Sequence, residues 1–370
     1  MNQKPVVTPL YALEANDLSV VLGGRKVLDI PSLQVLPNEV LVVIGPNGSG
    51  KTTFLLTLAA LLKPATGTIS YRGQAIGSGA DMLKLRRRQA VVFQDPLLLN
   101  TTVWNNVTLG LRLRGVKGAD AEQRTGRWLD RFGIASLAGR QAKTLSGGEA
   151  KRASLARAFV LQPEVLFLDE PFTGLDSPTR QSLIADFESV LRETKVTTVM
   201  VTHDSNEALA LAHRVVVLMH GRIRQTGSPE EVFSYPVDEE VAGFVEVGNV
   251  LHGVVDSQGE GLASVNVKGR QVDAVSGLVA GSNVTLFLRQ EDVTISLPQS
   301  RSAPSSARNQ LAGKVDRVLP AGYQMRVTLD CGFPLVALIT RRSWEELGLE
   351  VGREVTASFK ASSVHLIPRQ

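Results

Sequence analysis

The sequence contains almost no cysteine and has no long apolar run. Cys331 is the single cysteine among 370 residues, which excludes a disulfide within the chain and is typical of a reducing compartment. The best candidate for an apolar run, residues 52–62, has the length of one buried helix, whereas a bilayer-spanning helix needs ~20 apolar residues. We therefore expect no membrane-spanning helix, and the first residues also lack the apolar core of a signal peptide.

The composition is that of a folded protein with more than one domain. Hydrophobic residues make up 43% of the chain, which is enough for packed cores and excludes disorder as the main state. At about 150 residues per domain, the length predicts two or three domains. The net charge is only +4, and residues 301–370 carry it, with 10 Lys and Arg against 6 Asp and Glu. The absence of a strong basic patch argues against a nucleic-acid partner.

Two parts of the chain differ in pattern. Residues 1–236 alternate continuous apolar runs, such as 165–171, with amphipathic stretches, which predicts an α/β fold whose parallel sheet is covered on both faces. Within this part, residues 95–160 lack strand patterns and predict a helical subdomain. Residues 237–249 are expected to form a linker, and residues 250–370 show short alternating strands and glycine-containing turns, as in small, OB-like β-barrels.

The C-terminal part contains an internal repeat. The matching segments are 251–256 with 311–316, and 284–295 with 355–366. We predict two related β-units, about 250–297 and 306–368, which together form one all-β domain. The alternative is a chance similarity between Val-rich strands.

A glycine-rich segment follows a predicted strand and opens a predicted helix. It fits the phosphate-loop pattern G-x-x-x-x-G-K-[ST], in which glycines let backbone N–H groups surround a phosphate at the positive end of a helix. Lys51 is expected to reach the β- and γ-phosphates, and the Thr52 hydroxyl to ligate Mg²⁺. The residues predicted to bind nucleotide here are Gly45, Pro46, Asn47, Gly48, Ser49, Gly50, Lys51, Thr52 and Thr53.

Two carboxylates end the apolar run at residues 165–170. Asp169 is expected to hold Mg²⁺ through water, and Glu170 to polarise an attacking water molecule. The alternative is an ordinary strand end with solvated acids. Beside a phosphate loop, the pair predicts hydrolysis of a nucleoside triphosphate.

Three further motifs complete an ordered set. Gln94 lies in VVFQDP, LSGGE occupies residues 145–149 before a basic helix, and TGLD occupies 173–176, with His203 after the next apolar run. In this order the motifs resemble the nucleotide-binding cassette of ABC transporters, over about residues 11–235. The resemblance implies an ATPase with ATP and Mg²⁺ as cofactors, in which Gln94 senses Mg²⁺ and the membrane partner and His203 contacts the γ-phosphate.

The resemblance also implies a homodimer. Ser146, Gly147 and Gly148 would contact the γ-phosphate of ATP held by the other subunit, and Asp176 would lie across the interface. The LSGGE segment offers exposed N–H groups at a helix N-terminus, which suits an anion. Two positions depart from the family pattern: Glu149 stands where glutamine is commoner, and Leu22 stands where an aromatic ring is expected on the adenine.

The tail over roughly 306–368 resembles the molybdate-binding, Mop-type domains of molbindins, and the β-domain as a whole resembles the TOBE-type tail of importer ATPases. SARN at 306–309, ITRRSWEELGL at 339–349 and KASSV at 360–364 carry this likeness. The implied oxyanion-binding residues are Ser306, Ala307, Arg308, Asn309, Lys360, Ala361 and Ser362. Cationic groups with hydroxyl and N–H donors suit a tetrahedral dianion. The alternative is that these residues only close the barrel; the first β-unit has Val247-Gly248-Asn249 instead and is not expected to bind.

The leading hypothesis is an ATP-hydrolysing importer subunit at the cytoplasmic face of the cell membrane. It would dock on permease subunits and drive uptake of tungstate or molybdate delivered by an extracytoplasmic substrate-binding protein, with the β-domain sensing internal oxyanion. The segment 97–115 resembles tungstate-type cassettes, but the two oxyanions have nearly the same size and charge. Sulfate, iron and polyamine import remain alternatives, as do a soluble ABC ATPase and an oxyanion sensor.

Overall fold

The computed structural model describes residues 11–76, 80–245, 248–298 and 305–369, and the chain forms two compact units, Met1–Pro229 and Glu230–Gln370. Helix α8 (Pro229–Ser234) begins at this division. The segment expected as a linker, 237–249, contains helix α9 (Glu239–Phe244), which belongs to the second unit. Among the described residues, none of the helices combines the length and apolar character that crossing a membrane requires.

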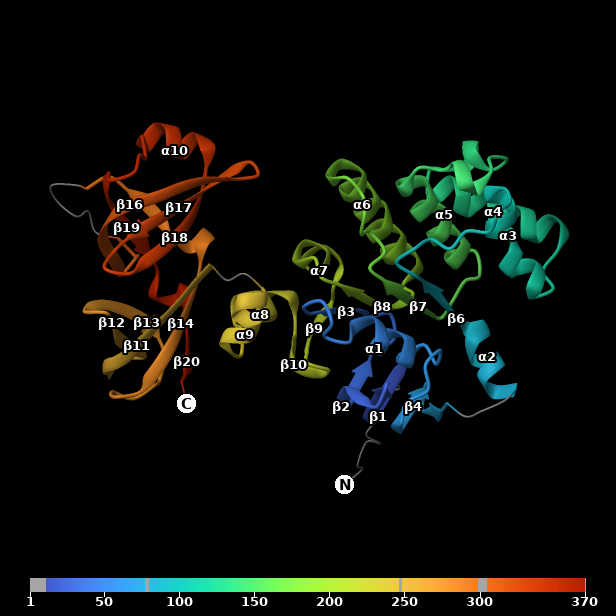
Figure 1. Ribbon diagram of the computed structural model, residues 1–370, viewed down its shortest axis with the longest axis horizontal. Coiled ribbons are helices and arrows are strands. Elements are labelled where there is room, and N and C mark those ends of the chain that lie inside the picture. The colour runs from blue at the N-terminus through green and yellow to red at the C-terminus, as the bar shows by residue number, and fades with distance from the viewer. Residues whose placement is uncertain (1–10, 77–79, 246–247, 299–304, 370) are drawn as a thin grey trace, which may run out of the picture. The chain divides into compact units, whose positions relative to one another are not determined.

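A six-stranded sheet forms the centre of the first unit (Figure 1). In spatial order its strands are β10 (Arg222–Gly227), β9 (Arg214–Met219), β3 (Val40–Ile44), β8 (Thr197–Thr202), β7 (Val165–Asp169) and β6 (Gln89–Val92). Five of them are parallel, and β10 is antiparallel to β9. Every residue of β3, β7 and β8 is buried, as expected when both faces of a parallel sheet are covered. The loops after β3, β6, β7 and β8 therefore meet at one edge of the sheet, where ligands bind in such folds.

Helices and a second sheet cover this central sheet. Helix α1 (Lys51–Leu58) packs against β7 and β8, whereas α7 (Ser205–Leu211) contacts β3 and β8 and also packs on α6 (Ser177–Thr194). An antiparallel sheet has the order β2 (Arg25–Val35), β1 (Leu13–Leu22), β4 (Thr66–Tyr71) and β5 (Gln74–Ala75), and it shares one apolar core with α1 and the central strands. Helix α2 (Ala80–Arg88) leads into β6.

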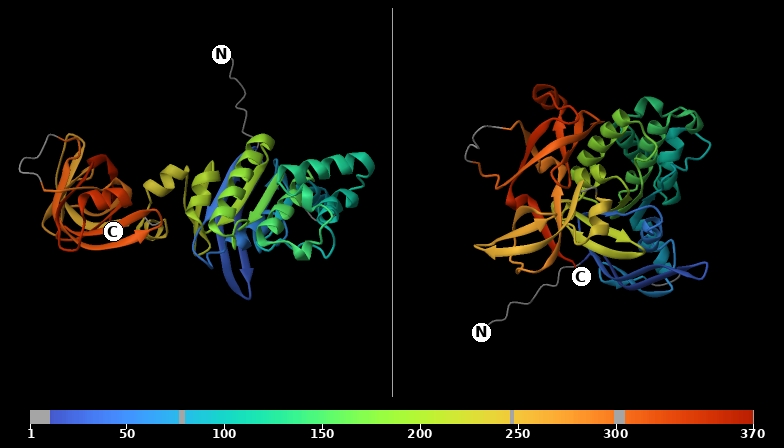
Figure 2. Two further views of the ribbon diagram at one scale, coloured as in Figure 1. Left: turned by 90° about the horizontal axis from the view of Figure 1, so that it is seen from above. Right: turned by 60° about the vertical axis from the view of Figure 1, so that its left-hand side comes forward.

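Helices alone fill the stretch between β6 and β7, in teal and green in Figure 2. They are α3 (Val103–Leu113), α4 (Gly118–Arg131), α5 (Gly147–Phe159) and the short 3₁₀ turns η1 (Ala135–Leu137) and η2 (Ala142–Thr144). Stacked and edge-on aromatic contacts among Trp128, Phe132, Phe159 and Phe187 join these helices to α6. The aromatic core fixes the start of α5, and thus the LSGGE segment, relative to α6.

The second unit contains two five-stranded sheets with the same internal order. One has β13 (Arg270–Val275), β12 (Leu262–Val267), β11 (Gly248–Gly259), β14 (Asn283–Arg289) and β20 (Val364–Pro368). The other has β18 (Pro334–Thr340), β17 (Gln324–Asp330), β16 (Asn309–Ala321), β19 (Glu354–Phe359) and β15 (Thr294–Ser296). Each half of the repeat therefore gives its last strand to the sheet of the other half. One apolar core contains residues of both sheets, and α10 (Arg341–Leu347) lies in the longer connection of the second half.

Two buried asparagines each form hydrogen bonds to the backbone of the edge strand in the other half of the repeat. Asn309 accepts a hydrogen bond from the Asp273 N–H at 2.7 Å and donates to the Asp273 carbonyl at 2.9 Å. Asn249, sixty residues earlier in the repeat, does the same with Val336, at 2.6 and 2.9 Å. Because β13 and β18 are edge strands, each side-chain amide supplies the pairing that a missing strand would have given.

Candidate functional site

The predicted phosphate loop connects β3 to α1. Gly48 and Gly50 have φ angles of 80° and 101°, in the left-handed region that favours glycine. Gly45 has no room for a side chain, since a Cβ there would lie 2.1 Å from the Leu218 carbonyl oxygen. The glycines thus let the backbone turn tightly onto the positive N-terminal end of α1.

Two polar side chains of this loop suit an anion. The Lys51 ammonium, 6% exposed, donates to the carbonyl oxygens of Gly45 at 2.9 Å and Pro46 at 3.1 Å. Burial lowers the pKa of Lys51, and the carboxylate of Glu170 opposes this effect. The buried Ser49 hydroxyl has no hydrogen-bond partner in the described part of the chain. An orphaned hydroxyl and an ammonium paired only with carbonyls fit phosphate oxygens.

A hydroxyl and a carboxylate meet where Mg²⁺ was predicted. Thr52 Oγ1 donates to Asp169 Oδ1 at 2.9 Å, across 117 residues of sequence. Burial raises the pKa of Asp169, and the Thr52 hydroxyl opposes the shift. Both oxygens are ligand types that Mg²⁺ prefers, and the ion usually takes its other ligands from substrate phosphates and water. The described residues contain no group of three or more His, Cys, Asp or Glu that could hold a metal ion. Asn47 is exposed at the turn, and Thr53 is half-buried in α1.

Glu170 occupies a constrained position directly after β7. Its backbone is in the left-handed region, with φ of 43°, and its N–H donates to the Val201 carbonyl at 2.9 Å. Thr173 Oγ1 donates to Glu170 Oε2 at 3.1 Å, and His203 Nδ1 lies 3.1 Å from the same oxygen. His203 is the more exposed of the pair, with 48% of its side chain accessible against 14% for Glu170. The carboxylate is therefore fixed from both sides, as a general base needs to be.

Gln94 follows β6 at the same edge of the sheet. Its side chain is exposed, and its carbonyl accepts a hydrogen bond from the Lys151 ammonium of α5. The structure thus brings the phosphate loop, the two acids and His203 to one edge of the central sheet. It places the loop that contains Gln94 (residues 93–102, the Gln94 loop) beside α5. This arrangement supplies phosphate donors, metal ligands and a general base for hydrolysis of a nucleoside triphosphate.

Comparison with known proteins agrees with this geometry. Residues 28–173 match the family model described as ABC transporter, and residues 305–366 match the TOBE domain. Molybdate/tungstate import ATP-binding protein WtpC of Pyrococcus horikoshii is 35% identical over 91% of this chain and 94% of its own length. Sulfate/thiosulfate import ATP-binding protein CysA of Burkholderia mallei is 34% identical over 92% of this chain and 95% of its own length. The chain belongs to the family of ABC transporter ATP-binding proteins.

A solved structure supports the assignment at the level of the cassette. A dimeric ATP-binding cassette in a post-hydrolysis state, bound to ADP and Pi, superposes with a TM-score of 0.54 and 26% identity, covering 59% of this chain and 98% of that one. As a member of this family the chain is an ATPase, and its fold is the ABC cassette followed by an all-β TOBE domain.

The LSGGE segment of this ABC protein forms the N-terminus of α5. Ser146 caps the helix by accepting from the Glu149 N–H at 3.3 Å, and Glu149 Oε2 accepts from the Ser146 N–H at 2.7 Å. That second hydrogen bond holds the pKa of Glu149 below its usual range, with the nearby Arg140 charge acting the same way. Glutamate at this position therefore serves as a capping residue. Gly147 and Gly148 begin the helix, and their N–H groups remain available at its exposed end.

Asp176 caps α6, accepting from the Thr179 N–H at 3.0 Å, which lowers its pKa. No hydrogen bond in the described part of the chain joins the 146–148 segment or Asp176 to the phosphate loop at 45–53.

Leu22 stands at the predicted adenine position, at the end of the β1–β2 hairpin. It pairs with Arg25 and is 44% exposed. Two residues after Arg25, the Val27 carbonyl lies 3.4 Å from where a Cβ on Gly50 would be, so β2 passes beside the phosphate loop. An aliphatic side chain at this hairpin offers contact with a base but no aromatic stacking.

Two of the predicted oxyanion residues follow a paired position of the TOBE domain. Asn309 is directly opposite Phe359 in the β16–β19 register, and Arg308 and Lys360 are the next residues beyond this pair, both exposed. Lys360 leads into the turn η4 (Ala361–Ser363), which lies against β13. Ser306 and Ser362 are exposed, Ala307 is half-buried and Ala361 is buried. The side-chain amide of Asn309 is already hydrogen-bonded to the Asp273 backbone.

The corresponding place in the first half of the TOBE domain is more acidic. With the repeat offsets, Gly248 stands for Arg308 and Arg289 for Lys360, whereas Glu291 and Asp292 of the turn η3 (Gln290–Asp292) stand for Ser362 and Ser363. Burial raises the pKa of Asp292, while the Arg289 charge opposes this. Two carboxylates, with no residue equivalent to Arg308, disfavour the binding of an anion here.

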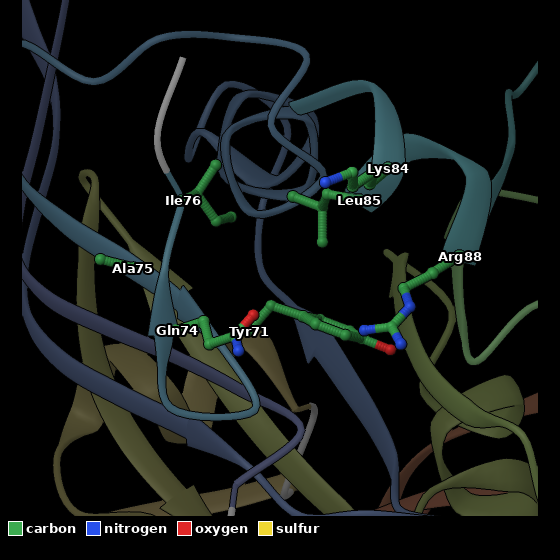
Figure 3. Close-up of a pocket in the computed structure, with 7 residues that line it drawn as sticks. All are labelled: Tyr71, Gln74, Ala75, Ile76, Lys84, Leu85 and Arg88. Carbon is green, nitrogen blue, oxygen red and sulfur yellow. The ribbon is translucent and has the colours of Figure 1, made fainter. Parts of the chain in front are cut away.

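A separate cavity of about 660 Å³ lies between the antiparallel sheet and α2 (Figure 3). The residues that line it are Tyr71, Gln74, Ala75, Ile76, Lys84, Leu85 and Arg88. The Tyr71 hydroxyl donates to Glu164 Oε2 at 2.6 Å, and Arg88 Nε lies 3.2 Å from Glu164 Oε1. Burial raises the pKa of Tyr71. These polar groups already have partners, and none of the predicted site residues lines the cavity.

Sequence reasoning missed several charged residues near the ATP site. Glu207 of α7 is 2% exposed and accepts from the Thr202 hydroxyl at 2.6 Å. Lys151 and Arg157 of α5 bind main-chain carbonyls of the Gln94 loop. The available signal is weak: in each case a charged residue stands on a helix face that would otherwise be apolar and inward.

Proposed function

We propose that this ABC ATPase energises the import of an oxyanion, tungstate or molybdate, through a membrane permease. The observation that carries the proposal is that the β16–β19 register ends with Asn309 opposite Phe359, and the exposed Arg308 and Lys360 are the next residues beyond this pair. We infer that these two cations are adjacent and that Ser306 and Ser362 lie near them. Two adjacent cations with hydroxyl donors suit a tetrahedral dianion. Sequence identity of 35% with a molybdate/tungstate import ATP-binding protein, over 91% of this chain, supports the same substrate class.

In the cassette, the residues of the sheet edge have separable roles. Lys51, Ser49 and the loop N–H groups would bind the ATP phosphates, and Mg²⁺ held by Thr52 and Asp169 would neutralise phosphate charge. Glu170 accepts a proton from the attacking water, with Thr173 and His203 fixing its carboxylate. The ring of His203 is 48% exposed, and we propose that it exchanges its contact with Glu170 for one with the γ-phosphate when ATP binds.

Two copies of the chain would form each complete ATP site. The N-terminus of α5, with its backbone N–H groups, is exposed, and so is Asp176 at the nearby N-terminus of α6. We place Ser146, Gly147 and Gly148 on the ATP held by the second copy. Gln94 would respond to Mg²⁺ and to permease subunits at the cytoplasmic face of the membrane, with an extracytoplasmic binding protein delivering the oxyanion.

Sulfate is the main alternative substrate, since a sulfate/thiosulfate import ATP-binding protein is nearly as similar. Calorimetric titration of the full-length chain with sodium tungstate, molybdate and sulfate distinguishes the tungstate or molybdate proposal from the sulfate alternative. We expect tungstate and molybdate to bind, sulfate to bind much more weakly, and Arg308→Met to abolish binding. Lys314→Met is the matched control, because Lys314 lies on the same strand pair but faces Glu354 at 3.4 Å. Tight binding of sulfate alone would favour the alternative, and no binding of any of the three would remove the basis for an oxyanion.

A further inference from the structure

Three polar side chains lie along one face of α5, three residues apart. Lys151, Ser154 and Arg157 all donate to main-chain carbonyls of the Gln94 loop, which follows β6. Lys151 Nζ donates to the carbonyl of Gln94 itself, and Ser154 Oγ to that of Pro96 at 3.4 Å. The helix thus binds the backbone of the loop and leaves the Gln94 side chain exposed.

Arg157 makes the most extensive of these contacts. Its guanidinium donates to the Pro96 carbonyl at 2.6 Å and to the Leu97 carbonyl at 2.8 Å. Leu97 has a φ of 44°, in a backbone region that non-glycine residues rarely adopt and that costs roughly 1–3 kcal/mol. The arginine therefore holds the loop in a conformation that the loop alone would not favour.

The far end of the loop is fixed separately. Asn106 of α3 is fully buried, accepts from the Leu99 N–H at 2.7 Å and donates to the carbonyls of Leu99 and Thr102, both at 3.0 Å. The α5 contacts act on the other half, which carries Gln94. Loss of these contacts would release residues 94–97 while the anchor at 99–102 stays in place.

The same helix begins at the LSGGE segment, so a rigid element joins the two motifs. Lys151 is five residues from Ser146, within one and a half turns of helix. We propose that Lys151, Ser154 and Arg157 are positioning residues that make the Gln94 loop and the LSGGE segment move as one body during the ATPase cycle. This rests on the roles proposed above for Gln94 and for residues 146–148.

Arg157 is the residue on which to test this, because Lys151 also affects the catalytic carboxylates. Burial lowers the pKa of Lys151, and the charges of Asp95 and Glu170 oppose the shift. Removing Lys151 would therefore change the electrostatic potential at Glu170 as well as the conformation of the loop. Arg152 provides a matched control on the same helix. It binds Asp186 at 2.5 Å and the Phe132 carbonyl at 3.1 Å, and makes no hydrogen bond to the Gln94 loop within the described residues.

The experiment compares the full-length wild type with Arg157→Met, Arg157→Lys and Arg152→Met. Hydrogen exchange of residues 93–99 and steady-state ATP hydrolysis are measured on each. For Arg157→Met we expect exchange in this segment to rise at least about tenfold and kcat to fall about tenfold, with KM for ATP within about twofold of wild type. Arg157→Lys should recover part of both effects, and Arg152→Met should leave both within about twofold of wild type, whatever it does to the melting temperature.

Two results would overturn the proposal. One is wild-type exchange in Arg157→Met, which would mean that the helix does not hold the loop. The other is faster exchange with unchanged kcat, which would mean that the position of the loop is irrelevant to turnover. The variant Gln94→Ala distinguishes failure of this positioning role from failure of the proposed function. If Gln94→Ala keeps the wild-type kcat, the role proposed for Gln94 in the ATPase cycle is wrong, whatever the hydrogen-exchange data show.

Discussion

Glu207 should make the free energy of unfolding fall as the pH rises from about 4.5 to about 7. Its carboxyl is 2% exposed, and burial raises its pKa from 4.5 to about 7, while the Thr202 hydroxyl acts the other way. Between these pH values the folded state keeps a proton that the unfolded state has lost, so stability decreases with rising pH and levels off above about pH 7. At about 1.4 kcal/mol per pKa unit, the fall is about 3 kcal/mol.

Glu207→Gln tests this because the amide keeps an oxygen to accept from Thr202 but cannot ionise. Urea unfolding of the variant and the wild type, followed by tryptophan fluorescence, should give similar free energies at pH 4.5. At pH 8 the variant should be more stable by about 3 kcal/mol. The exposed helix residue Glu122 supplies a control, and Glu122→Gln should change the free energy by less than about 0.5 kcal/mol at both pH values. A difference between Glu207→Gln and wild type that does not vary with pH would refute the reasoning.

Three other predictions concern the two sites. Glu170→Gln should lower kcat by about 10²–10⁴ while the dissociation constant for ATP stays within about twofold of wild type. An equally large loss of ATP affinity would show that Glu170 mainly binds nucleotide. Asn309→Ala should lower the free energy of unfolding of the TOBE domain by about 1–3 kcal/mol in thermal or urea melts, since Asp273 on the edge strand loses its partner, and an unchanged midpoint would contradict this. Titration should find one tungstate per chain; two would mean that the Gly248 and Glu291 position also binds.

The arrangement of the predicted ATP site follows from the sequence because its residues form short motifs at the ends of strands. Gly45–Thr52 is contiguous in sequence, and parallel strands bring their carboxyl ends to one edge, so the approach of Thr52 to Asp169 follows from the sheet. The contacts of Arg157 could not be predicted in this way. Its partners are backbone carbonyls about sixty residues away, and a carbonyl carries no sequence signal.

The TOBE domain shows a similar limit. The repeat was visible because Leu251 and Leu311 begin matching segments, yet the exchange of β15 and β20 between the sheets was not, because a strand pattern does not specify its neighbour. Asn309 was expected to bind an oxyanion, whereas its amide closes the edge of β13. Residue type alone does not show that an amide will pair with backbone, so this second role of Asn309 could not be predicted, and its part in oxyanion binding stays a prediction.

Uptake of the oxyanion in intact cells tests the central claim most directly. Accumulation of tungstate and molybdate is measured in the natural host after deletion of the gene for this chain, and again with wild type or Glu170→Gln supplied on a plasmid. We predict that deletion abolishes accumulation at low external concentration, that the wild type restores it and that Glu170→Gln does not. Unchanged accumulation of both oxyanions after deletion would contradict the account.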